Sequence, residues 1–303
     1  MKCKLCVIIA VIVCLFPIVS PTLALCLGIM FSLLKISGAG WEKQSGTLLK
    51  ASVVLMGFGM SFTQVVATSK SSFLVTAVSV GLILITGVLL GRLLKVDSNV
   101  SWLIAAGTAI CGGSAIAAIA PVIKAKEEQI TFALVVVFVL NAIALLVFPF
   151  IGHLFHLNQI TFGYWAAIAI HDTSSVVGAG AAYGTKALEV ATIVKLTRAL
   201  WIIPVSIGIV LFQPKGEKKQ IAIPWFIFLF VAAILLTYLL PDYSNWYNHL
   251  AWLGKRGLVV ALFFIGSSIS FPAMKQSGMK SFVLGGTLWV LVCVISLLVF
   301  IHL

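Results

Sequence analysis

Long apolar runs, separated by short polar connections, constrain this chain more than any other feature. They fall near residues 5–19, 21–36, 47–68, 71–94, 98–123, 129–152, 160–184, 187–212, 222–240, 250–271 and 280–302. A helix of about 20 apolar residues crosses the roughly 30 Å of bilayer hydrocarbon, and most runs are long enough to do so. Only 9% of the 303 residues are charged, whereas about a quarter are charged in an ordinary soluble domain. The polar side chains are too few to cover a water-facing surface.

In lipid, only helices and closed barrels satisfy the backbone polar groups, and barrel strands would alternate over short segments. We therefore expect an all-α polytopic membrane protein with about nine to eleven transmembrane helices. Because the connections are short, residues 1–303 are expected to form a single membrane domain. The N-terminal runs are expected to be retained spans, with the N-terminus in the cytoplasm and the chain in the inner membrane.

A net charge of +12 raises the question of nucleic-acid binding. The cations lie between the apolar runs and form no basic domain. The positive-inside rule accounts for cations in cytoplasmic connections. We expect the lipid bilayer, and not nucleic acid, to be the partner of this chain.

Two of the apolar runs are interrupted near their middles. Glycine pairs and Ser/Thr clusters release backbone groups from the helical ladder, which membranes tolerate only inside protein or beside a wet cavity. Paired breaks of this kind are the best sequence indication of a transporter site. The first break contains Cys111, Gly112, Gly113 and Ser114, and the second contains His171, Asp172, Thr173, Ser174 and Ser175.

The breaks predict an inverted-repeat core, with repeat-like halves at 47–152 and 160–303. A weak recurrence along the chain agrees with two halves: Gly57, Ser61, Phe62, Ser72 and Phe73 match Gly266, Ser270, Phe271, Ser281 and Phe282 at one fixed offset. If both broken runs are re-entrant hairpins, Lys124 and Lys126 join most other cations on one side. The two breaks then enter from opposite faces. We favour hairpins, and two crossing helices are the alternative.

Asp172 lies in the middle of an apolar run, where an acid is costly and indicates function by default. One interpretation is a proton or Na⁺ coupling site, with His171 beside it able to titrate near neutral pH. The other is a cap, in which the Asp172 carboxylate accepts hydrogen bonds from the first N–H groups of the following half-helix. Both roles can hold together.

The remaining candidates concern an anion. A half-helix start presents unpaired N–H groups and a positive dipole end, so the segments after both breaks are predicted to bind a small anion. Lys195 and Arg198 lie deep in the run 187–212 on one side of the helix, and they could attract that anion. Alternatively, they form an ion pair with Asp172 or Glu189. Asn141 is more simply an interhelical hydrogen bond than a site contact.

Three blocks resemble the YeiH family of membrane proteins, which are described as sulfate exporters. They are AGTAICGGSAIAAIAPVIKAKEE (Ala106–Glu128), IHDTSSVVGAGAAYG (Ile170–Gly184) and ATIVKLTR (Ala191–Arg198). The likeness covers most of the chain, with the blocks in order. The resemblance implies an inner-membrane transporter with an inverted-repeat core.

We therefore expect a secondary transporter of small anions, such as sulfate, related sulfur oxyanions or organosulfonates. A passive anion channel and a non-transporting enzyme or receptor are the alternatives. No catalytic motif is present, so we expect no enzyme activity, no metal site and no cofactor. A homodimer is compatible with the sequence.

Overall fold

The computed structural model describes residues 2–16, 18–34, 42–211, 225–268 and 279–301. Within these ranges every regular element is a helix, which confirms the all-α prediction. Five described helical segments are long and apolar enough to cross a membrane: Phe62–Leu93, Glu127–Leu154, Thr185–Ile209, Pro241–Ser267 and Met279–Ile301.

The chain divides into two compact units, residues 1–67 with 225–270 and residues 68–224 with 271–303. The first unit contains α1 (Lys2–Leu15), α2 (Pro21–Leu33), α3 (Glu42–Gly57), α12 (Trp225–Leu239), a 3₁₀ turn (Pro241–Tyr243) and α13 (Ser244–Ser268). The second contains most of α4 (Phe62–Leu93), then α5 (Ser98–Ala109), α6 (Gly113–Ile119), α7 (Glu127–Leu154), α8 (Gln159–Ala169), α9 (Thr173–Tyr183), α10 (Thr185–Ala199), α11 (Ile202–Leu211) and α14 (Met279–Ile301).

In the first unit, α13 packs along α2 and α3. α13 and α2 meet closely at Gly28 of α2 and Gly266 of α13, where a Cβ built on Gly266 would lie 3.1 Å from the Gly28 Cα atom. Small residues are what allow helix backbones to meet this closely in a membrane. Gly266 therefore serves a packing contact. Two other positions of the recurrence, Ser270 and Phe271, lie outside the described residues.

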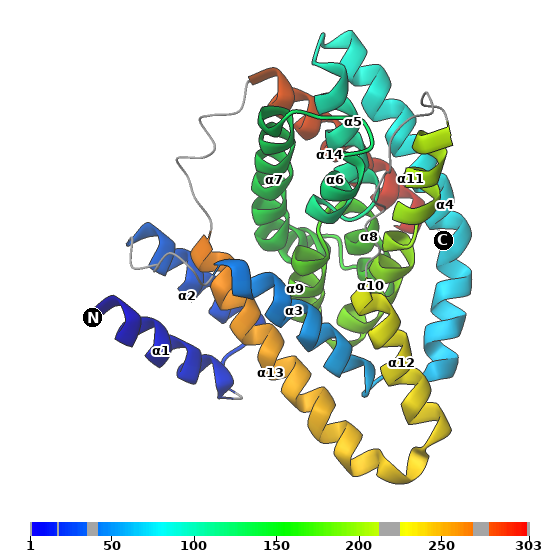
Figure 1. Ribbon diagram of the computed structural model, residues 1–303. Coiled ribbons are helices and arrows are strands. Elements are labelled where there is room, and N and C mark those ends of the chain that lie inside the picture. Colours follow the sequence, from blue (N-terminus) through cyan, green and yellow to red (C-terminus); the bar gives the residue numbers. More distant parts are fainter. Residues whose placement is uncertain (1, 17, 35–41, 212–224, 269–278, 302–303) are drawn as a thin grey trace. The chain divides into compact units, whose positions relative to one another are not determined.

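In the second unit, α7 lies at the centre of the packing. It contacts α5, α6, α9 and α14, and α10 packs against α8 and α9 (Figure 1). One buried cluster joins α5, α6 and α7 with Leu284 of α14. The first broken element is therefore held in an apolar core.

One expected boundary is wrong. The runs 47–68 and 71–94 predicted a connection near Lys70, but α4 continues through that residue and the chain breaks at Phe58–Ser61. The turn there is closed by backbone bonds such as Met60 N–H to the Gly57 carbonyl, 3.1 Å. Lysine and serine cost a helix little, whereas glycine costs about 1 kcal/mol relative to alanine. Gly57 and Gly59, and not the charge of Lys70, mark the end of the helix.

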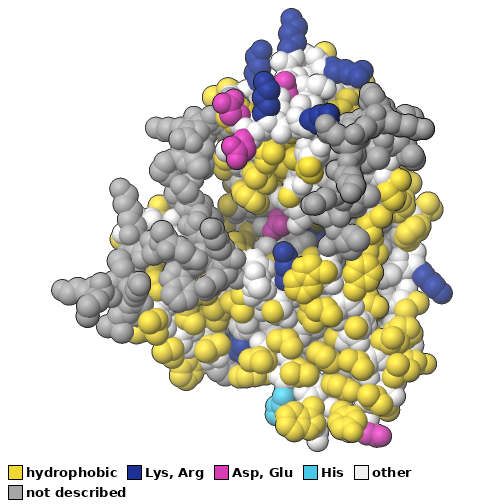
Figure 2. All heavy atoms as spheres, viewed as in Figure 1, with side chains coloured by type: hydrophobic (Ala, Val, Ile, Leu, Met, Phe, Trp, Pro, Cys, Tyr) yellow, Lys and Arg dark blue, Asp and Glu magenta, His cyan; other side chains and the backbone are white. Residues whose placement is uncertain are grey.

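The surface is that of a protein in lipid. Figure 2 shows hydrophobic side chains over much of the visible described surface, with cationic and acidic side chains gathered toward the top of the view. On α4, Leu74 and Leu82 are 71% and 59% exposed. Four exposed cations surround the point where α4 ends and α7 begins: Arg92, Lys95, Lys124 and Lys126.

Candidate functional site

The first broken run folds back on itself. A Cβ built on Gly107 of α5 would lie 3.0 Å from the Ile116 side chain of α6. In one straight helix, nine residues would separate these positions by about 13.5 Å. The backbone reverses at Gly112, whose φ of +67° is one that glycine adopts without the steric cost of a side chain. α5 and α6 are therefore the two arms of a hairpin.

The base of this first hairpin is closed by a polar network. The Asp97 carboxylate caps α5 by accepting from the Asn99 N–H at 2.9 Å, and it also accepts from the Gln129 side chain at 2.8 Å. The Asn99 side chain in turn donates to Gln129 at 3.2 Å. Because Gln129 lies in the first turn of α7, the hairpin begins and ends at the same end of α7.

The second broken run also folds back. The rings of Phe162, in the first turn of α8, and Tyr183, at the end of α9, are stacked with centroids 3.8 Å apart and an interplanar angle of 8°. Twenty-one residues of straight helix would span about 31 Å. The Tyr183 hydroxyl also donates to the Leu157 carbonyl, just before α8 begins. α8 and α9 are therefore the arms of a second hairpin.

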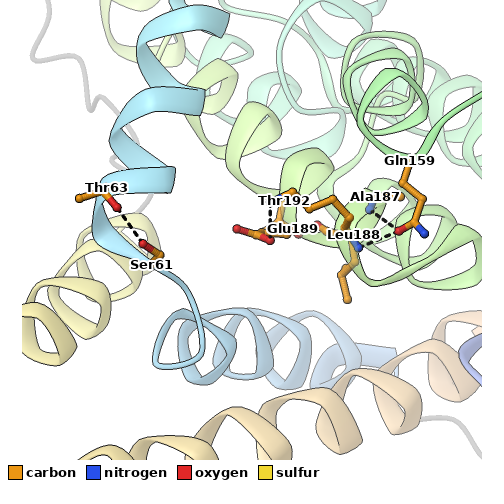
Figure 3. Close-up of polar contacts among 8 residues, drawn as sticks. Ser61, Thr63, Gln159, Ala187, Leu188, Glu189 and Thr192 are labelled. Atoms are coloured by element: carbon orange, nitrogen blue, oxygen red, sulfur yellow. Dashed lines mark hydrogen bonds and ion pairs between the residues drawn. The ribbon is translucent and has the colours of Figure 1, made fainter. Parts of the chain in front are cut away.

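A glutamine closes this second base as well. The Gln159 side-chain oxygen accepts from the backbone N–H groups of Lys186 and Ala187, at 2.8 and 3.3 Å (Figure 3). Asn158 caps α8 by accepting from the Thr161 N–H at 2.8 Å. Each hairpin thus starts with a capped half-helix and has a glutamine that ties its two ends together.

The two hairpins enter from opposite ends of α7. That helix has 28 residues, or a length of about 42 Å. Its first turn carries Gln129 of the first base, and its last residues lead directly to Gln159 of the second. The hairpins that the sequence analysis favoured are confirmed, together with their opposite entry.

The two tips meet at the middle of α7. A Cβ built on Gly112 would lie 3.2 Å from the Asp172 Cβ, so the first tip rests against the second. The Asn141 side-chain oxygen, halfway along α7, accepts from the Asp172 N–H at 3.1 Å. Asn141 is therefore the interhelical hydrogen bond we expected, and its partner is the break itself. It belongs to the site, which the sequence alone did not show.

The predicted anion-binding residues divide into an accessible and a buried set. Ser114 is exposed, Gly113, Asp172, Thr173 and Ser174 are partly exposed, and Cys111, Gly112, His171 and Ser175 are buried.

Asp172 caps α9, since one carboxylate oxygen accepts from the Ser174 N–H at 2.9 Å. Both ring nitrogens of His171 are buried and have no hydrogen-bond partner among the described residues. The accessible polar groups thus gather where the second arm of each hairpin begins.

Lys195 and Arg198 are fully buried behind the tips, on α10. The Lys195 ammonium donates to the carbonyls of Ile170 at 2.8 Å and Ala167 at 3.4 Å. The Arg198 guanidinium donates to Ala167 at 3.2 Å, Ile168 at 2.5 Å and, across the tips, Thr108 at 3.0 Å. These carbonyls belong to the last turns of α8 and α5, which carry negative partial charge.

Neither cation forms the ion pair considered from the sequence. Within the described ranges, no carboxylate lies at ion-pair distance from Lys195 or Arg198, and Glu189 pairs with Lys186 at 3.2 Å. A charged side chain at the bilayer centre costs at least about 3 kcal/mol, and a hydrogen bond to a charged group returns about 1.5–3 kcal/mol. The five bonds to carbonyls are enough to hold both cations in place without a carboxylate.

A cavity of about 470 Å³ lies at the base of the second hairpin and away from the tips. Its lining residues are Asn158, Gln159, Ile160, Thr161 and Lys186. It lies at one end of α7, so it is not the place where the breaks meet.

Two opposed hairpins with adjacent tips define a helical membrane protein built on inverted, broken elements. The chain belongs to the family described as "Conserved hypothetical protein 698", which matches residues 3–285. It is 45% identical to the UPF0324 membrane protein VV1_3166 of Vibrio vulnificus over 296 residues, 96% of this chain and 95% of that one. It is 47% identical to a UPF0324 membrane protein of Bacteroides thetaiotaomicron, over 92% of this chain and 86% of that one.

A third relative, GSU2818 of Geobacter sulfurreducens, is 46% identical over 94% of this chain and 92% of its own. No solved structure matches. These names confirm the membrane assignment that the YeiH resemblance implied, and they state no substrate.

Proposed function

We propose that this protein is a secondary transporter of small anions that works by alternating access. The observation that carries the proposal is the meeting of two opposed hairpins at mid-helix, with Ser114, Asp172, Thr173 and Ser174 accessible around the contact. Irregular backbone at membrane depth needs surrounding protein or a wet cavity, and transporters place their substrates at such breaks.

The start of α9 supplies the binding chemistry. The first N–H groups of a helix lack partners within the helix, and the dipole there favours negative charge. The hydroxyls of Thr173 and Ser174 add further donors beside them. Such a set suits an oxyanion, and sulfate or a related sulfur oxyanion or organosulfonate is the substrate class that the YeiH resemblance favours.

Asp172 provides the coupling. An ionised carboxylate about 4 Å from a bound anion would oppose binding by about 4 kcal/mol at an effective dielectric constant of 20. That is a loss of roughly 1,000-fold in affinity. Binding of a proton or Na⁺ at Asp172 would remove the repulsion, so the anion and the cation favour each other's entry. His171, one residue away, is the candidate to pass the proton on.

The cations around the first hairpin base orient the protein. Arg92, Lys95, Lys124 and Lys126 are exposed at that end of α7, and the positive-inside rule places them in the cytoplasm. The second hairpin then opens to the other side of the inner membrane, with the N-terminus in the cytoplasm.

The test is reconstitution of the purified protein into proteoliposomes loaded with sulfate, sulfite, thiosulfate, taurine or a carboxylate. Accumulation of one anion against its gradient, driven by a pH or Na⁺ gradient, is the expected result. Flux that ignores both gradients would indicate a passive channel. Retention of every anion under all gradients would overturn transport and favour an enzyme or a receptor.

A matched pair of variants tests the role of Asp172. Asp172→Asn keeps a cap on α9 but removes the charge, and it should abolish gradient-driven accumulation while leaving exchange of anion for anion. Asp97→Asn makes the same change in the cap of α5, at the base of the first hairpin, and should transport normally. Equal rates for Asp172→Asn and the unchanged protein would exclude coupling at Asp172.

A further inference from the structure

The carbonyl ends of the two first arms, α5 and α8, carry an inference that rests on the proposed function. Both arms end in the middle of the second unit, where their last carbonyls have no partner in the next turn of helix. In transporters built on broken helices, such carbonyl ends coordinate the coupling Na⁺. Here they are occupied by side chains of the protein.

The Lys195 ammonium is placed as a bound monovalent cation would be. It contacts two carbonyls of one arm, Ala167 and Ile170, and is buried from solvent. A monovalent cation in the same place would use the same oxygens. Arg198 extends this arrangement to the other arm, because it joins the carbonyls of Ile168 and Thr108.

We propose that Lys195 and Arg198 are built-in counter-cations that occupy the cation positions at the carbonyl ends of α5 and α8. They position the two breaks and do not touch the substrate. The protein therefore binds no Na⁺ at these carbonyls, and the coupling cation, a proton or Na⁺, is left to Asp172. This reassigns both residues from the anion-binding role that the sequence favoured to a positioning role.

A cation-binding test separates this inference from transport. The melting temperature of the purified, detergent-solubilised protein is measured at constant ionic strength in NaCl, ethylammonium chloride or choline chloride. Asp172→Asn, which has no carboxylate at the tips to bind Na⁺, should melt at one temperature in all three salts. Lys195→Ala should melt lower in choline, and Na⁺ or ethylammonium should raise its melting temperature by several degrees with a saturable dose response.

Lys195→Met is the matched control. Methionine fills most of the space of the lysine side chain and brings no charge, so this variant should melt lower and show no rescue by either cation. Lys186→Ala removes a cation at the hairpin base and should show no rescue either. Rescue of Lys195→Ala by choline as well as by Na⁺ would overturn the inference.

Asp172→Asn, in which Lys195 is intact, tests the inference even if Lys195→Ala does not fold. A saturable rise of its melting temperature in Na⁺, absent in choline, would show that the carbonyl ends are open to Na⁺ and would contradict the proposal. Because melting needs no substrate, this result stands whether or not the reconstituted protein moves any anion. Failure of transport and failure of the counter-cation role are thus observed separately.

Discussion

Gly112 and Asp172 come from two different hairpins and lie in direct contact, since a Cβ built on the glycine would stand 3.2 Å from the Cβ of the aspartate. The two residues are 60 positions apart in the sequence and enter from opposite ends of α7. Asn141 on α7 binds the Asp172 N–H at the same place. A displacement of one hairpin must therefore change the contacts at the tip of the other.

Gly112→Ala tests this contact. Gly112 has φ +67° and ψ −128°, a conformation that costs other residues about 1–3 kcal/mol, and the added methyl group would press on Asp172. We expect a lower melting temperature and loss of transport. Gly81→Ala in α4 is the control, because no atom lies within 4 Å of its added Cβ and alanine favours the helix by about 1 kcal/mol. An unchanged Gly112→Ala protein would show that the tips do not touch.

Asn141→Leu is expected to destabilise the second break. It leaves the part-buried Asp172 N–H without an acceptor, and an unpaired buried group costs about 1–3 kcal/mol. Asn141→Asp keeps an acceptor and should recover most of the melting temperature at low pH, where the new carboxyl is neutral. Ser206→Ala removes a buried hydroxyl without a hydrogen-bond partner and should have little effect. Thermal unfolding of the four proteins in parallel distinguishes these outcomes.

The sequence predicted the breaks because their chemistry is carried by residue types. Glycine and serine in an apolar run, and an aspartate far from any connection, mark positions where the helix cannot continue normally. The opposite entry of the two hairpins followed from the distribution of cations. These features depend on residue types, so they can be predicted from the sequence alone.

The partners of Lys195 and Arg198 were not predictable in the same way. A buried cation suggests a carboxylate, and Asp172 was the natural candidate in the sequence. In the structure the acceptors are backbone carbonyls. Every residue has a carbonyl, so the sequence does not show which carbonyls will bind a buried cation. Gln129 and Gln159 were missed for a similar reason, because a glutamine at the end of an apolar run resembles an ordinary interfacial residue until its partners are known.

Asp172 should tolerate loss of its charge better than loss of its oxygen atoms. Its carboxylate caps α9 through the Ser174 N–H, and asparagine is about as good a cap as aspartate. Asp172→Asn should therefore unfold within about 0.5 kcal/mol of the unchanged protein, whereas Asp172→Ala should lose about 1 kcal/mol. The measurement is chemical or thermal unfolding in detergent. Equal losses in both variants would mean that the charge, and not the cap, stabilises the break.

The hairpin shape of the second break can be tested by the pair Phe162 and Tyr183. Their rings stack at a centroid distance of 3.8 Å, although 21 residues separate them in the chain. In a protein whose native cysteines are replaced by serine or alanine, the double variant F162C/Y183C should form a cross-link with a short bifunctional thiol reagent. The variant also carries a protease site between the two positions, and its folding is checked first. After cleavage, a cross-link is detected as two fragments that remain joined.

Phe162→Cys combined with Ala169→Cys is the control, because Ala169 ends the same arm and lies about 10 Å along the helix axis from Phe162. The short reagent should not join that pair. If instead Phe162 and Tyr183 were the two ends of one crossing helix, they would be about 31 Å apart and no reagent of this length could reach. Absence of the F162C/Y183C link in a correctly folded protein would therefore favour the crossing arrangement, and would remove the opposed hairpins on which the proposed transport site depends.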